Sequence, residues 1–251
     1  EVVTATSEKY AACFGFTEGE VFAALDEYGL SDRKQEVKRW YDGFTFGGMA
    51  DIYNPWSIIN YLDKKRLGAY WANTSSNSLV GKLLQEGSKG MKQDFEELLQ
   101  GRSLRMEIDE QVVYSQLAEK KDAVWSLLLA SGYLKVAETE YVERTGGWRY
   151  SLALTNREVR VMFENMVRGW FGRYEEEYND FIRALLMDDV KVMNYYMNKV
   201  ALAMFSYFDT GRNPSGEEPE RFYHGFVLGL MVDLSDRYIL TSNRESGGSQ
   251  T

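Results

Sequence analysis

The sequence predicts a mainly α-helical protein with a small β component, an α+β fold. Only three of the 251 residues are proline, and the helix-favouring residues Leu, Met, Glu and Lys are frequent. The runs 133–137 and 148–154 alternate apolar and polar residues around a polar turn that contains Gly146 and Gly147, which is typical of a β-hairpin. A third observation is a dense group of aromatic residues among turn formers in residues 40–78, which predicts a compact aromatic core.

Composition narrows the class of protein. A hydrophobic content of 44% with 27% charged residues is ordinary for a globular chain, and a net charge of -9 argues against broad attraction to nucleic acid while leaving a local basic patch open. The single cysteine, Cys13, excludes an internal disulfide and suits a reducing cytoplasm. No run approaches the roughly 18 apolar residues that span a membrane, so we expect no membrane partner. The chain opens at Glu1 without an initiator Met, which we interpret as a fragment.

The first elements follow from capping and turn signals. Thr17 with Glu20 forms a capping box, which opens a helix that Gly29 ends. Residues 31–46 are expected to carry a charged helix that leads into a turn at Asp42 and Gly43, and a further helix follows Pro55 over residues 57–62. Trp40, Tyr41, Phe44, Phe46, Tyr53, Trp56, Tyr61, Tyr70 and Trp71 are the aromatic residues of the predicted core.

Residues 92–160 show a different pattern of predicted elements. We expect a helix that ends at Gly101, a strand over 104–108, a helix over 119–131, the β-hairpin, and a helix capped by Asn156. The order helix, helix, hairpin and helix is similar to a winged helix. The candidate nucleic-acid contacts on or near the wing are Arg144, Arg149, Arg157 and Arg160. Glu138, Glu140, Glu143 and Glu158 lie in the same region and offset them, so packing between domains is the favoured interpretation of the wing and DNA contact the alternative.

The last part of the chain is predicted to be helical over 157–209, with Asp188 or Asp189 as a cap. Residues 210–219 carry Gly, Asn and two Pro and are expected to form a loop at a boundary. A helix over 220–234 and a strand over 238–240 are expected to follow.

Three motifs in fixed order carry a resemblance. They read W-Y-D-G-F at 40–44, Y-N-P-W-S at 53–57 and Y-W-A-N-T-S-S-N at 70–77. They resemble the motifs W-Y-(D/N)-G-(F/Y), Y-N-P-(W/F)-S and Y-W-x-N-T-S-x-N of bacterial AAA-ATPase-like proteins with a C-terminal PD-(D/E)XK nuclease-like domain. Similarity at 14–17 and 222–226 extends this resemblance over nearly the whole chain.

The resemblance implies an order of regions. Residues 1–90 would be an aromatic-rich helical lid-like region of the ATPase-like domain, and 91–160 a winged-helix-like region. Residues 161–209 would form a helical connector, and 220–251 the truncated start of the nuclease-like domain. The nucleotide-binding core would precede Glu1, and full-length relatives would use ATP and Mg²⁺ as ATPases, nucleases or both.

Candidate site residues follow from the same resemblance. Asn73, Thr74 and Asn77 have a functional interpretation as a nucleotide-facing lid, although capping and turn hydrogen bonds explain them more simply. Asp233, Asp236 and Glu245 could form one acidic edge of a magnesium site, and Glu245 is the weak catalytic candidate.

Two motifs that ATP hydrolysis and metal-dependent phosphodiester cleavage would require are missing from the sequence. The chain contains no G-x-x-x-x-G-K-(S/T) loop and no E-x-K after residue 245, so we expect these residues to carry no bound cofactor and neither ATPase nor nuclease activity. The only histidine, His224, excludes a histidine-rich metal site, and beside Tyr223 on a predicted helix we expect it to be a structural hydrogen-bonding residue rather than a catalyst. The predicted role is therefore non-catalytic, coupling the nucleotide-binding core to the nuclease-like module. The alternative is a helical module that binds protein or nucleic acid and has no enzymatic role.

Overall fold

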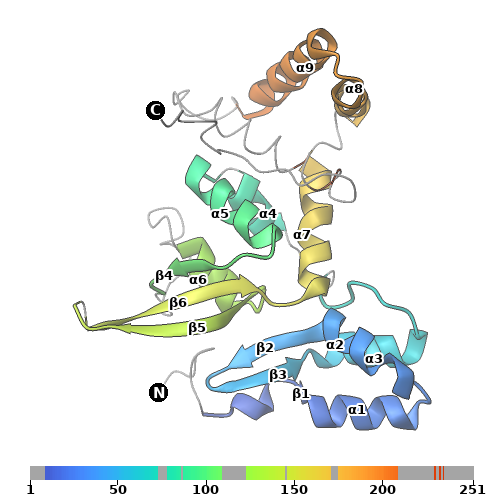
Figure 1. Cartoon of the computed structure of the whole chain (residues 1–251), viewed down its shortest axis with the longest axis vertical. Helices are drawn as coiled ribbons and strands as arrows, with labels where there is room; N and C mark the ends of the chain where they lie inside the picture. Colours follow the sequence, from blue (N-terminus) through green and yellow to red (C-terminus); the bar gives the residue numbers. More distant parts are fainter. Residues whose placement is uncertain are drawn as a thin grey trace, which may run out of the picture. The chain divides into compact units, whose positions relative to one another are not determined.

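The computed structural model describes residues 9–72, 78–85, 87–108, 123–144, 146–170 and 175–208, with the single positions 229, 232 and 234. The predicted class is confirmed: the described residues form an α+β fold of helices with two small antiparallel sheets (Figure 1). The helices are α1 (Glu18–Glu27), α2 (Lys34–Tyr41), α3 (Pro55–Lys64), α4 (Ser78–Gln85), α5 (Lys89–Leu99), α6 (Ala123–Ala130), α7 (Arg157–Trp170), α8 (Glu175–Leu186) and α9 (Val190–Phe208), with short 3-10 turns η1 (Ala11–Cys13) and η2 (Ser31–Arg33). The strands are β1 (Phe16–Thr17), β2 (Asp42–Phe46), β3 (Met49–Tyr53), β4 (Leu104–Met106), β5 (Leu134–Val142) and β6 (Gly147–Leu154).

Contacts divide the chain into two compact units. The first comprises Glu1–Gly81 and Glu97–Phe163, and the second Lys82–Glu96 and Glu164–Thr251. The predicted regions 1–90 and 91–160 therefore both contribute to the first unit.

A side-chain cap starts α1, as predicted, and another starts α3. In the predicted capping box, the Thr17 N–H donates to Glu20 Oε2 at 2.8 Å and the Glu20 N–H donates to Thr17 Oγ1 at 3.4 Å. At α3, Asn54 Oδ1 accepts from the Trp56 N–H at 2.9 Å, and Pro55 occupies the first turn, where its missing N–H costs nothing. The helix is longer than the predicted 57–62 and runs to Lys64.

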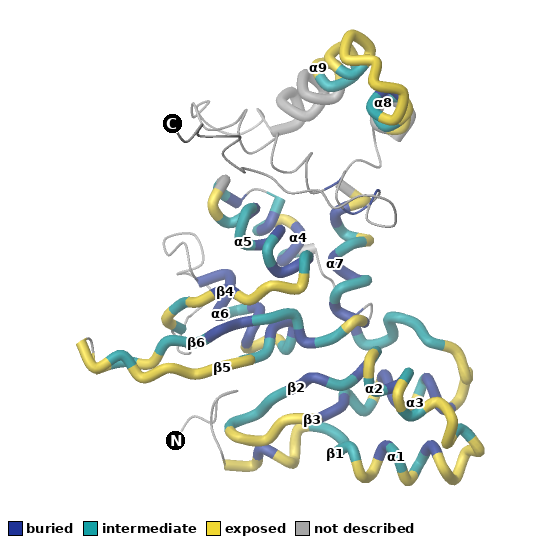
Figure 2. Tube along the Cα trace, viewed as in Figure 1, coloured by how far each residue is buried: buried dark blue, intermediate teal, exposed yellow. Residues whose placement is uncertain are grey.

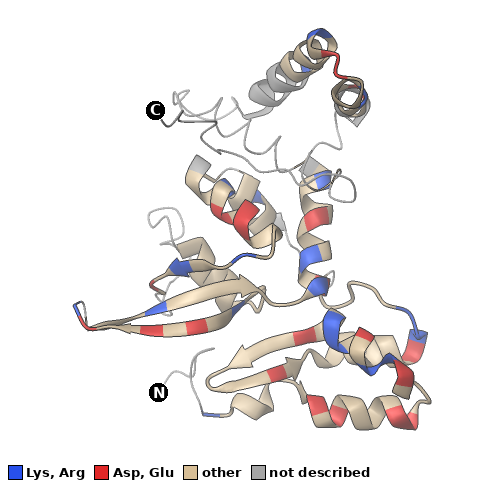
Figure 3. Cartoon of the chain, in the orientation of Figure 1, with Lys and Arg blue, Asp and Glu red and all other residues tan. Residues whose placement is uncertain are grey.

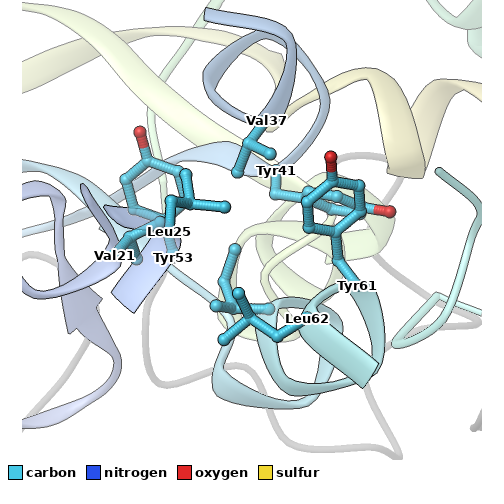
Figure 4. Packing of buried hydrophobic residues seen from close by; sticks show 8 residues of the cluster. Val21, Leu25, Val37, Tyr41, Tyr53, Tyr61 and Leu62 are labelled. Carbon is cyan, nitrogen blue, oxygen red and sulfur yellow. The ribbon is translucent and has the colours of Figure 1, made fainter. Parts of the chain in front are cut away.

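The aromatic core of the first unit joins three helices and a strand. Its members are Val21, Leu25, Val37, Tyr41, Tyr53, Ile58, Tyr61 and Leu62 (Figure 4). They come from α1, α2, β3 and α3, and buried and exposed residues alternate along α1 and α3 (Figure 2). Burial of this much aromatic and aliphatic surface is the main force that holds these elements together.

The predicted aromatic core is confirmed at Tyr41, Tyr53 and Tyr61, which are at most 2% exposed. It is wrong at Trp56, which is 53% exposed. The buried residues of α3 are 57, 58, 61 and 62, a stripe with helical spacing, and position 56 lies off that stripe.

The second sheet contains the predicted hairpin. Its strand order is β4-β6-β5, and β5 pairs antiparallel with β6 from Leu134 opposite Leu154 to Val142 opposite Gly147. Both strands reach further towards the turn than the predicted runs, with a register shift between Val136 and Glu138. Strand β4 is shorter than the predicted 104–108, and of the predicted helix 119–131 the structure describes only α6, which ends at Ala130.

The predicted helical stretch 157–209 is confirmed where it is described, as α7, α8 and α9. In the second unit, α8 packs against α9, and Asp189 Oδ1 accepts from the Val192 N–H at 3.1 Å, which confirms the cap. The predicted loop 210–219 lies outside the described residues, as does the predicted nuclease-like start 220–251 apart from positions 229, 232 and 234. Among the described helices, none combines the length and apolar character that a bilayer crossing requires.

The capping box at α1 should contribute measurably to stability. Replacing Thr17 by Ala removes the hydroxyl that accepts from the Glu20 N–H, and we expect the free energy of unfolding to fall by about 1 kcal/mol in urea titrations. Thr17→Ser keeps the hydroxyl and serves as the control. An equal loss in both variants would mean that the cap is not the cause.

Candidate functional site

A buried carboxylate, that of Glu158, lies at the centre of the first unit. Its side chain belongs to the first turn of α7 and is fully buried. The preceding Asn156 caps the helix, because its Oδ1 accepts from the Val159 N–H at 3.0 Å. A carboxylate in the first turn of a helix also meets the positive end of the helix dipole.

Glu158 binds two of the three motifs. The Ser57 hydroxyl donates to Glu158 Oε2 at 2.7 Å, and the Trp71 N–H donates to Glu158 Oε1 at 2.7 Å, with the Ala72 N–H further away at 3.4 Å. We call these four residues the Glu158 junction. Ser57 ends the motif Y-N-P-W-S, and Trp71 and Ala72 stand immediately before Asn73 in the third motif.

The first motif, W-Y-D-G-F, lies against the same stretch of chain. Asn156 Nδ2 donates to the Tyr41 carbonyl at 3.2 Å, so the motif W-Y-D-G-F is held next to the start of α7. A Cβ at Gly43 would lie 2.0 Å from the Thr155 carbonyl oxygen, a distance that no side chain tolerates. The residues 155–158 therefore hold all three motifs within one packed region of the first unit.

Burial governs the electrostatics of the junction. Burial raises the pKa of the Glu158 carboxyl, and hydrogen bonds from Ser57 and from the backbone N–H groups of residues 70–72 limit that rise. The Ser57 hydroxyl and the Trp71 and Ala72 N–H groups all donate to carboxylate oxygens of Glu158. The carboxylate can therefore hold the backbone of residues 71–72 in place.

A second charged group surrounds Lys38, and we call it the Lys38 cluster: Glu18, Lys38, Asp42 and Asp51. Lys38 Nζ contacts the Glu18 carboxylate and lies 3.4 Å from Asp51 Oδ1 and 4.0 Å from Asp42 Oδ2. The Tyr53 hydroxyl also donates to Glu18, at 3.4 Å. Among the described residues, no group of three or more His, Cys, Asp or Glu has the arrangement of a metal site.

Asp42 has the least favourable electrostatic environment in the Lys38 cluster. Burial raises the pKa of Asp42 to about 6, the Asp51 carboxyl adds to the rise, and Lys38 and Lys135 oppose it. Asp42 Oδ1 is buried without a hydrogen-bond donor. A hydrogen bond between the two carboxyls requires a proton on one of them, so the same geometry favours the protonated form.

The four candidate nucleic-acid arginines occupy different environments. Arg144 is exposed at the hairpin turn, and Arg149 lies opposite Glu140 across the two strands. The Arg157 guanidinium lies 5.3 Å from the centre of the Trp40 ring, and Arg160 donates to the Leu99 carbonyl. Acidic and basic residues share the β5–β6 hairpin (Figure 3). DNA contact through these residues stays a prediction.

The other candidate site residues lie outside the described residues. These are Asn73, Thr74 and Asn77 of the third motif and Asp233, Asp236 and Glu245 of the predicted metal edge. The described chain resumes at residue 78, so Ala72 is the last described residue before the lid candidates.

Sequence reasoning missed both charged groups. It treats Glu158 as one of the acidic residues that offset the wing arginines, whereas the structure buries it against Ser57 and Trp71. For the Lys38 cluster, the four-residue spacing of Lys38 and Asp42 on and after α2 is a usable local signal. Glu18 and Asp51 come from other elements and leave none.

Comparison with known proteins gives one distant relative. Over 154 residues the chain is 25% identical to an uncharacterized protein in the vnfD 5′ region of Azotobacter chroococcum mcd 1. The match covers 61% of this chain and 27% of that protein, so the chain spans only about a quarter of the relative's length. No family model matches the chain, and no solved structure matches it significantly.

Neutralising Glu158 should destabilise the first unit. In Glu158→Gln, one acceptor oxygen remains and the new amide group faces a backbone or hydroxyl donor, so we expect the free energy of unfolding to drop by about 2 kcal/mol in urea titrations. The matched control is Glu143→Gln at the exposed hairpin turn, which should change it by less than about 0.5 kcal/mol. Equal effects of the two changes would contradict the junction.

Asp42 should make stability depend on pH. Its folded-state pKa lies above the unfolded value, so the protonated carboxyl stabilises the fold below about pH 4 and that contribution is lost as the pH rises through about 6. Asp42→Asn should therefore match the wild type near pH 4 and exceed its free energy of unfolding by about 1–2 kcal/mol at pH 7, after allowance for solvent screening.

Urea titrations at several pH values measure this difference, with Asp32→Asn at an exposed position of η2 as the control. A gap between Asp42→Asn and wild type that stays constant across the pH range would rule out Asp42 as its source.

Proposed function

We propose that this chain is a non-catalytic coupling region of an AAA-ATPase-like protein, which links a nucleotide-binding core to a C-terminal nuclease-like module. The observation that carries the proposal is the Glu158 junction, because it ties the start of α7 to two of the three motifs of the resemblance. The core and the nuclease-like module are then its partners, ATP and Mg²⁺ act outside these residues, and the location is cytoplasmic.

The junction offers a route for coupling. Glu158 holds the backbone of Trp71 and Ala72, which immediately precede the lid candidates Asn73, Thr74 and Asn77. A change in residues 73–77 on nucleotide binding would pull on this backbone and so on the first turn of α7. Helix α7 continues from the first unit, which ends at Phe163, to Trp170 in the second. Helix α7 would therefore receive a displacement at its first turn and transmit it along its own length.

The relative agrees with a role inside a longer protein. The matched segment, 25% identical to this chain, makes up 27% of the Azotobacter protein. The sequence itself contains no phosphate-binding G-x-x-x-x-G-K-(S/T) loop, so the proposal assigns phosphate binding to the core.

The test uses the protein expressed from its complete reading frame. Addition of MgATP should change amide hydrogen exchange in residues 157–163 of the wild type, and Glu158→Gln should abolish that change while ATP still binds, because the lid backbone is no longer held to α7. Glu143→Gln should respond like the wild type. The 251-residue chain alone should hydrolyse no ATP.

Two results would contradict the coupling role: an exchange response at α7 that Glu158→Gln leaves intact, or ATP hydrolysis by the 251-residue chain alone. A complete protein in which nucleotide never affects α7 would favour the alternative, a helical interaction module.

One observation favours that alternative. Tyr141 and Trp148 form an edge-to-face pair with ring centres 5.1 Å apart near the hairpin turn, and they are 52% and 53% exposed. Exposed aromatic rings beside Arg144 can stack on bases or on a partner's apolar side chains. The same pair also stabilises the hairpin as a cross-strand contact.

A further inference from the structure

A small cavity lies in the first unit, lined by β2 residues and by the C-terminal end of α6. Its volume is about 150 Å³, and its lining includes Phe14, Phe44 and Phe46 together with Ala130, Ser131 and Gly132. None of the described residues that line it carries a charge. The proposed coupling role makes no use of this cavity.

Three phenyl rings supply aromatic surface to the cavity. The rings of Phe14 and Phe46 have centres 4.9 Å apart with planes inclined by 37°, and those of Phe44 and Phe46 are stacked at 6.4 Å. Phe44 is 7% exposed, whereas Phe14 is 49% exposed and leaves the aromatic wall open to solvent. The face of an aromatic ring carries negative potential and attracts cations.

The end of α6 adds a second source of negative potential. Gly132, with φ of +79°, ends the helix; its N–H donates to the Leu129 carbonyl at 3.0 Å, and the Tyr133 N–H donates to the Leu128 carbonyl at 2.9 Å. The last turn of α6 contains no basic residue. Backbone N–H groups satisfy the Leu128 and Leu129 carbonyls, and the negative potential that remains at this end is not neutralised by a side chain of the helix itself.

These features select among ligands by charge and size. An anion would meet negative potential from both the rings and the helix end. Mg²⁺ or Ca²⁺ would lose its water without gaining the carboxylate oxygens that it requires. An alkylated ammonium ion is weakly hydrated and apolar on its surface, and a cavity of about 150 Å³ accommodates a group about as large as benzene.

We propose that this cavity binds an alkylammonium cation, with the head group against Phe14, Phe44 and Phe46 and its positive charge facing the C-terminal end of α6. The net charge of -9 favours the approach of cations to the chain as a whole.

The test separates charge from shape. The 251-residue chain is titrated with choline, with tetramethylammonium, and with 3,3-dimethylbutan-1-ol, the uncharged carbon analogue of choline, and the dissociation constants are measured by NMR chemical-shift changes at residues 129–134. Choline should bind roughly two- to thirtyfold more tightly than the uncharged analogue. Equal or tighter binding of the uncharged analogue, or no binding of either ammonium ion, overturns the proposal.

Substitutions at the rings test the aromatic wall. Phe14→Leu and Phe46→Leu keep an apolar side chain and remove a ring face, so each should lower choline affinity while leaving the uncharged analogue within about twofold. Tyr28→Leu changes an aromatic residue that is 51% exposed and does not line the cavity, and it should change neither affinity. A loss of choline binding in Tyr28→Leu as large as in the ring variants would contradict the site.

A tethered cation tests the helix end without altering the rings. Ala130 is exposed, so Ala130→Lys can place an ammonium group at the cavity and should weaken choline binding, whereas Ala130→Gln, of similar length and uncharged, should weaken it much less. Equal effects of the two substitutions would argue that bulk alone acts at this position.

A last arm distinguishes the source of the ammonium group. Acetylated and amide-capped Nε-trimethyl-lysine is compared with choline on the same chain. Tighter binding of the capped amino acid assigns the cavity to a modified side chain of a partner, and tighter binding of choline assigns it to a free small molecule; failure of both overturns the proposal.

Discussion

A buried, hydrogen-bonded carboxylate is the constraint on which the first unit depends. Removing a carboxylate from water is costly, and a hydroxyl and two backbone N–H groups that converge on Glu158 offset part of that cost, since its pKa stays above the usual value. Ser57 lies 101 residues away in the sequence and Trp71 lies 87 residues away. If either partner is displaced, the carboxylate loses part of this compensation, which couples the positions of the surrounding elements.

Close packing around the junction strengthens this dependence. The backbone of Gly43 approaches the Thr155 carbonyl too closely for a side chain, and the Thr155 hydroxyl donates to the Gly132 carbonyl at 2.7 Å. Gly132 follows the last residue of α6 and lines a cavity together with Phe44 and Phe46. The small residues and the Asn side chains of this region thus have steric and hydrogen-bonding reasons to be where they are, independent of any activity.

The parts of the fold that could be predicted from the sequence are those whose signal is local. A capping box needs Thr17 and Glu20 three positions apart, and the hairpin needs two alternating runs around glycines, so both are confirmed. Trp56 was placed wrongly because the sequence does not say which side of α3 faces the core.

Glu158 and the Lys38 cluster were missed for a related reason. Beside Arg157 and Arg160, Glu158 has the local appearance of a solvated charge, and its burial depends on segments far away in the chain. Of the partners of Lys38, Asp42 lies four residues away and leaves a local signal, whereas Glu18 in α1 and Asp51 in β3 leave none. Local capping and alternation can be derived from a sequence, whereas the pairing of distant charges requires the tertiary arrangement.

The long separation between Ser57 and Glu158 has a consequence for biosynthesis. A ribosome releases residues 1–81 well before α7, yet the polar groups at Ser57 and at residues 71–72 gain their acceptor only when position 158 has left the exit tunnel. We therefore expect the nascent segment 1–81 to complete its folding only after α7 emerges, when the segment 82–96 of the other unit has already been synthesised. We expect the exposure of this segment to chaperones and proteases during translation to end once α7 has emerged.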